Sequence, residues 1–113
     1  MPMDKQPETI IEMDSALMDK VRDGSKVISI RPGRLAYPLG PALVRDAGGT
    51  QRDIQVTILR LSHCRLKHVP YVDLAVWAGD TTTHAVLRDI LSRRFPGITL
   101  DDEVTVIRYR VGS

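Results

Sequence analysis

Three side chains that could do chemistry stand close together in residues 24–31: Lys26, Ser29 and Arg31. A hydroxyl beside a desolvated lysine is a known arrangement for attack on a carbonyl carbon, with the amine as general base. An arginine beside them can bind a phosphate or a carbonyl oxygen. These polar residues interrupt a run of β-branched apolar residues, where a purely structural strand would carry none. The segment is therefore a candidate catalytic strand.

The geometry of a regular strand separates two of these residues. Successive side chains alternate between faces, so Ser29 and Arg31 share one face and Lys26 lies on the other. Lys26 and Ser29 can cooperate only if the strand bends, or if Lys26 sits on the turn that the preceding Gly24 predicts. Simpler interpretations also stand, with Lys26 as a solvated strand start and Ser29 as a hydroxyl satisfied by the backbone.

Size and charge restrict the class of protein. The chain has 113 residues and a formal net charge of +2, which predicts one domain, over residues 10–113, after a flexible leader over residues 1–9. From Lys26 to Arg94 the basic residues outnumber the acidic ones by about two to one, which suits either an anionic partner or a solvated basic surface. A lone Cys64 excludes an internal disulfide, and no apolar run is long enough for a signal peptide or a membrane span, so a cytoplasmic protein is expected.

The elements that must position the candidate strand follow from periodicity. Apolar residues at helical spacing predict a helix over residues 10–21, ended by Gly24. Residues 32–41 are rich in proline and glycine and predict a loop. Residues 42–62 predict a hairpin whose second arm turns Ile54, Val56 and Ile58 toward the core.

The second half of the chain predicts two helices and a strand. Residues 70–77 form the first helix, and the second begins with Asp80 or a following threonine as N-cap. Its expected buried stripe consists of Val86, Leu87, Ile90, Leu91 and Phe95. Residues 104–111 form the last strand. The sum is an α+β fold with a mainly antiparallel sheet that curls into a small barrel with flanking helices.

A metal site is not expected. His63, Cys64 and His68 are the only clustered soft ligands, and the five-residue separation of the histidines fits neither a helical pair nor a standard zinc spacing. The sequence predicts no metal and no cofactor.

Four short motifs in order resemble the ASCH domain, a PUA-like β-barrel. The motifs are Gly24-x-Lys26-x-Ile28-Ser29-Ile30-Arg31, Gly40-x-x-Leu43, Arg94-Phe95-Pro96-Gly97 and the terminal Val106-Ile107-x-Tyr109. The resemblance covers nearly the whole chain from about Ile10. Within that superfamily the chain is most similar to the small bacterial N4-acetylcytidine amidohydrolases, whose first strand reads Gly-x-Lys-Thr-Ile-Thr-Ile-Arg.

The resemblance implies a catalytic trio. Lys26 falls on the family lysine, Ser29 on a threonine, and Asp80 on a glutamate ahead of the second helix. The implied activity is hydrolysis of the amide of an acylated nucleoside such as N4-acetylcytidine, with Arg31 and Arg34 binding substrate. Serine and aspartate keep the functional groups of the residues they replace, but Asp80 is one methylene shorter. Asp80 also fits the simpler role of a helix cap.

Two other functions use the same residues differently. An RNA-binding module would need no trio and would contact phosphates through a basic surface made of Arg31, Arg34, Arg65, Lys67 and Arg94. A ribonuclease, the activity suggested for some ASCH proteins, would use these cations to stabilise a phosphate being cleaved. The expected partner is thus a nucleoside or RNA and not a membrane, and the sequence leaves the oligomeric state open.

Overall fold

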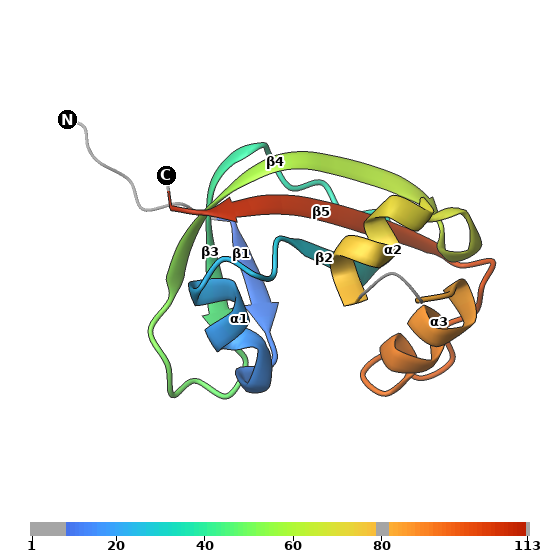
Figure 1. Cartoon of the computed structure of the whole chain (residues 1–113), viewed down its shortest axis with the longest axis horizontal. Coiled ribbons are helices and arrows are strands. Elements are labelled where there is room, and N and C mark those ends of the chain that lie inside the picture. The colour runs from blue at the N-terminus through green and yellow to red at the C-terminus, as the bar shows by residue number, and fades with distance from the viewer. Residues whose placement is uncertain (1–8, 79–81, 113) are drawn as a thin grey trace.

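The computed structural model describes residues 9–78 and 82–112, which are built around one five-stranded sheet (Figure 1). The strands are arranged in the order β1-β3-β4-β5-β2. Their bounds are β1 (Ile10–Met13), β2 (Ile28–Pro32), β3 (Gly40–Asp46), β4 (Ile54–Arg65) and β5 (Glu103–Val111). Only β1 and β3 run parallel, and the other neighbours are antiparallel. The sheet curls into a half-barrel, so the predicted α+β, mainly antiparallel fold is confirmed.

The N-terminal helix prediction is wrong for its first part. Residues 10–13 form β1, and helix begins only with the 3₁₀ turn η1 (Ser15–Leu17) and continues as α1 (Met18–Arg22). Ile11 and Met13 are buried on one face of the strand. The spacing of Met13, Leu17 and Val21 satisfies a helix, but the first four residues gain a backbone ladder along the edge of β3, which outweighs the propensity of so short a segment.

The hairpin prediction is confirmed. Strands β3 and β4 pair antiparallel from Gly40 opposite Ile58 to Val44 opposite Ile54. Ile54, Val56 and Ile58 are buried as expected. The second arm is longer than predicted, because β4 continues past residue 62 to Arg65 along the full length of β5.

The long strands β4 and β5 span two separate apolar clusters. One packs α1 against β1, β3 and the first part of β4, while the other packs β2 against the helices that follow β4. A register shift between Ile58 and Arg60 marks the passage from one cluster to the other. Such an irregularity bends a strand and increases its twist, which fits the curl of the sheet in Figure 1.

Three helical elements follow β4: the 3₁₀ turn η2 (Leu66–His68), α2 (Tyr71–Ala78) and α3 (His84–Ser92). A threonine caps α3 as predicted, since the Thr83 hydroxyl accepts a hydrogen bond from the Val86 backbone N–H at 3.2 Å. Leu87 and Leu91 are buried, but Val86 and Ile90 are 43% and 36% exposed, so the predicted five-residue stripe is narrower than expected. In the described part of the chain, no helix is long and apolar enough to cross a membrane.

Candidate ligand-binding site

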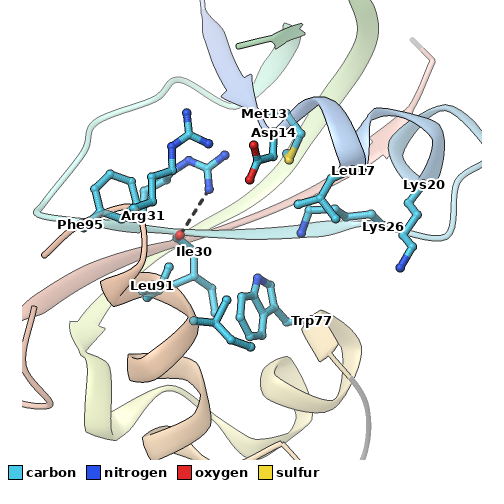
Figure 2. A pocket seen from close by; sticks show the side chains of 12 residues that line it. Met13, Asp14, Leu17, Lys20, Lys26, Ile30, Arg31, Trp77, Leu91 and Phe95 are labelled. Carbon is cyan, nitrogen blue, oxygen red and sulfur yellow. Dashed lines mark hydrogen bonds between the residues drawn. The ribbon is translucent and has the colours of Figure 1, made fainter. Parts of the chain in front are cut away.

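A cavity of about 360 Å³ opens between the N-terminal elements and the C-terminal helices (Figure 2). One wall comes from the end of β1, from η1 and from α1; β2 forms the floor; α2, α3 and the segment after α3 form the other wall. We call it the cation-lined cavity, because its polar residues are Lys20, Lys26, Arg31 and Arg94, with Asp14 as the one acid among the lining residues. Four cations against one carboxylate give the site an excess of positive charge.

Lys26 reaches this cavity from the turn before β2. The turn follows α1, where Gly24 adopts a φ of 84°, and the Lys26 backbone N–H donates to the Lys20 carbonyl at 2.9 Å. Strand β2 begins only at Ile28, so Lys26 is not bound to the alternation of the strand. Its Nζ donates to the Ile28 carbonyl at 2.8 Å and lies 6.0 Å from the centre of the Trp77 ring.

The Lys26 ammonium is more acidic than that of an ordinary lysine. Burial, helped by the positive charges of Arg31 and Lys20, lowers its pKa from 10.5 to about 8. Desolvation disfavours the ammonium, and neighbouring cations act in the same direction. Close to neutral pH a fraction of the molecules therefore carries Lys26 as a free amine, which a general base requires.

Arg31 both lines the cavity and ties the sheet together. Its Nη2 donates to the Glu12 carbonyl of β1 at 2.6 Å, and Nη1 donates weakly to the Ile30 carbonyl at 3.4 Å. Since β1 and β2 are the two edge strands, this guanidinium bridges the opening of the half-barrel. Burial, followed by the charge of Arg94, lowers the pKa of Arg31. In Figure 2, Arg31 lies with Phe95 on one side of the cavity, and Lys20 and Lys26 lie on the other.

Ser29 does not line the cavity, in contrast to the arrangement that the trio requires. Its side chain is fully buried, and its hydroxyl shares a 3.2 Å hydrogen bond with the Tyr109 hydroxyl. Burial raises the pKa of Tyr109, so its phenol stays neutral and keeps the proton that it can donate in this hydrogen bond. The regular strand alternation holds here: Ile30 lines the cavity, and Ser29 points to the other face of β2.

The remaining predicted residues are divided between the cavity and the surface. Asp80 lies outside the described residues. Arg94 lines the cavity. Arg34 forms an ion pair with Glu103 at 2.9 Å. Arg65 and Lys67 both lie near Asp101, at 4.0 and 2.6 Å. The structure therefore brings together Lys26, Arg31 and Arg94, and places Arg34, Arg65 and Lys67 in ion pairs elsewhere.

The clustered histidine and cysteine residues are not part of this site. His63 makes a 2.6 Å hydrogen bond between its Nε2 and the Leu35 carbonyl, and Cys64 lies on the same strand, half-buried. Within residues 9–78 and 82–112, no three His, Cys, Asp or Glu side chains are grouped closely enough to hold a metal ion.

The sequence reasoning missed three residues that line the cavity. Trp77 lies within the helix predicted over residues 70–77, Asp14 and Lys20 lie within the helix predicted over residues 10–21, and none of the three was given a site role. Tryptophan combines a large apolar ring with a polar N–H group and is enriched at interfaces, and this was the one sequence signal for Trp77. For Asp14 and Lys20 the exposed helical surface was an adequate explanation, and only the tertiary structure places them at the cavity.

The fold has relatives among solved structures. No family model matches the chain, and no curated protein gives a significant sequence match. The chain is similar to the crystal structure of an ASCH domain from Lactobacillus crispatus, with a TM-score of 0.67 and 18% identity over 93% of this chain and 80% of that one. It is also similar to a DUF984 protein from Enterococcus faecalis, with a TM-score of 0.65 and 12% identity over 96% of this chain and 82% of that one. At such identities the likeness shows the fold alone, which is ASCH-like.

Proposed function

We propose that the protein hydrolyses the amide of an acylated nucleoside, such as N4-acetylcytidine, in the cation-lined cavity. One observation carries the proposal: Lys26 holds an amine of lowered pKa in that cavity, 6.0 Å from the centre of an aromatic ring that can stack on a nucleobase. The motif around Lys26 and the ASCH-like fold support the same reaction class by analogy.

In the proposed reaction the base of the nucleoside lies against Trp77, and its acyl group lies near Lys26. The Lys26 amine takes a proton from a water molecule whose oxygen attacks the acyl carbon. The C–N bond then breaks, the proton passes from Lys26 to the leaving nitrogen, and a carboxylic acid and the free nucleoside are released. Water is the nucleophile here, because the Ser29 hydroxyl is buried against Tyr109. Asp80 remains the proposed residue for orienting Lys26 or the water.

RNA binding and RNA cleavage receive less support from the contacts. The surface proposed for RNA needs free cations along a track, and three of its five members, Arg34, Arg65 and Lys67, are occupied by Glu103 and Asp101. Exposed ion pairs of this kind are weak, but each reduces the local charge on which phosphate binding depends.

The test is turnover of N4-acetylcytidine, followed as the appearance of cytidine by chromatography. A general base contributes about 10²- to 10⁴-fold to rate, so Lys26→Ala should lose activity by about that factor. Lys26→Arg is the informative companion, because it keeps the positive charge but cannot act as a base. It should be as inactive as the alanine variant.

Two further measurements make the test decisive. The neighbouring Ser25→Ala changes an exposed residue outside the cavity, and it should keep full activity. For the wild type, kcat/KM should rise with pH and level off above about pH 8, because the pKa of Lys26 is about 8. The proposal is abandoned if no cytidine forms, or if Lys26→Arg turns over as fast as the wild type.

A further inference from the structure

Among the residues that the structure describes, the cations of the cavity differ from most of the others in having no aspartate or glutamate within ion-pair distance, although Asp14 also lines the cavity. Outside the cavity, eight of the eleven lysines and arginines in the described chain lie within ion-pair distance of an aspartate or glutamate. Of the four that line the cavity, none has such a partner among the described residues. Grouping like charges costs free energy, and a bound anion would offset that cost.

The positive charge is arranged at two positions within the cavity (Figure 2). Lys26 and Lys20 lie on the side next to Trp77, and Arg31 lies on the other side, beside Phe95. Arg94 immediately precedes Phe95 and also lines the cavity. Arg31 and Arg94 both line this cavity, and the charge of Arg94 contributes to the lowered pKa of Arg31. Two guanidinium groups that converge on one space are suited to a phosphate, which can accept several N–H bonds at once.

We propose that the substrate of this cavity is a nucleoside monophosphate, whose phosphate is held by Arg31 and Arg94 while its base lies against Trp77 near Lys26. The inference rests on the proposed function and refines its substrate class from a neutral nucleoside to an anionic nucleotide. A neutral nucleoside would offer no charge to Arg31, which is partly desolvated, whereas a phosphate would offset that cost.

A mononucleotide fits the structure better than a polymer. The cavity measures about 360 Å³, which is at the small end for ligand pockets and suits one nucleotide unit. A longer chain would need further cations to follow its backbone. Two of the cations expected for an RNA track, Arg34 and Lys67, are paired with Glu103 and Asp101.

The experiment compares the binding of cytidine and cytidine 5′-monophosphate by calorimetry at low salt. Hydrogen bonds to charged groups contribute about 1.5–3 kcal/mol, so the phosphate should tighten binding by about tenfold to a hundredfold. Arg94→Gln should remove most of this preference. The adjacent Arg93→Gln is the matched control, since Arg93 is exposed and lies outside the cavity, and it should keep the preference.

The outcomes separate this inference from the proposed reaction. Equal affinities for cytidine and its monophosphate would overturn the phosphate site even if N4-acetylcytidine is hydrolysed. A phosphate-dependent preference without any amide hydrolysis would support the site and overturn the reaction. A short cytidine oligonucleotide that binds more tightly than the monophosphate, or inorganic phosphate that competes as well as the nucleotide, would overturn the assignment to a mononucleotide.

Discussion

Replacing Lys26 by methionine should make the folded protein more stable at neutral pH. Burial and neighbouring cations lower the Lys26 pKa from 10.5 to about 8 in the folded state. Each pKa unit corresponds to about 1.4 kcal/mol, so holding the ammonium in the cavity costs about 3 kcal/mol at pH 7. Methionine has a similar length and no charge, and it removes that cost.

The expected gain is smaller than the electrostatic cost alone. The substitution also removes the hydrogen bond from Nζ to the Ile28 carbonyl, worth about 1 kcal/mol, and the contact with the Trp77 ring, worth about 0.5 kcal/mol. The net increase in the free energy of unfolding should be about 1–2 kcal/mol at pH 7. Urea denaturation of the two proteins measures it.

The pH dependence identifies the cause. Because the folded-state pKa of Lys26 is lower than that of the unfolded chain, the unfolded state binds the extra proton between about pH 8 and 10.5. The wild type therefore gains stability as pH rises through this window. The advantage of Lys26→Met should shrink between pH 7 and about pH 9.5 and then reverse, as only the lost contacts remain.

A control and a contrary result complete this test. Lys67→Met removes an exposed lysine paired with Asp101, so it should lower the free energy of unfolding by at most about 1 kcal/mol both at pH 7 and at about pH 9.5. The reasoning is refuted if Lys26→Met is less stable than the wild type at pH 7, or if its advantage is the same at both pH values. Either result would mean that the Lys26 ammonium is not desolvated in the cavity.

Two further substitutions test the parts of the fold that frame the cavity. Asp46 accepts hydrogen bonds from the Gly48, Thr50 and Gln51 backbone N–H groups in the β3–β4 turn, and from the Ser15 hydroxyl, which keeps its pKa far below the usual value. Asp46→Asn should therefore be less stable than the wild type in urea at pH 7. The difference in the free energy of unfolding should diminish as pH falls below about 3.8, where the unfolded carboxylate takes up its proton. A difference that grows in acid would contradict the stabilising role of the Asp46 carboxylate. Arg31→Gln loses the hydrogen bond to the Glu12 carbonyl and should lower the free energy of unfolding by about 1–2 kcal/mol. Amide hydrogen exchange in β1 should also become faster. Unchanged exchange in β1 would show that the Arg31 hydrogen bond does not hold this edge strand.

Much of the fold could be predicted from local sequence signals. The hairpin of β3 and β4, the helix α2, the threonine cap of α3 and the last strand all follow from alternation, turn residues and capping residues, which act over a few positions. The strand β1 could not be predicted in this way. Its partner β3 lies some thirty residues further along the chain, and the pairing decides the conformation of a segment whose own spacing fits a helix.

The candidate site could be predicted only in part. Lys26 and Arg31 were identified as site residues, and both line the cavity. Strand alternation predicted that Arg31 shares a face with Ser29 and not with Lys26. That rule describes only the direction in which a side chain leaves the backbone, not how far the side chain then reaches. Arginine is long and β2 is an edge strand, so the guanidinium extends around the edge to β1 and into the cavity, whereas the short Ser29 side chain stays where the alternation directs it.

The position of the cavity follows from the incomplete closure of the sheet. Strands β1 and β2 are its two edges, and both contribute to the cavity, through Met13 at the end of β1 and through Ile30 and Arg31 in β2. Arg31 crosses that opening to the Glu12 carbonyl and keeps other N–H donors for a ligand. Arg31 therefore ties the two edge strands together and is also one of the proposed ligand-binding residues. For this reason Arg31→Gln should affect stability and nucleotide affinity together, while the exposed Arg94→Gln should affect affinity alone.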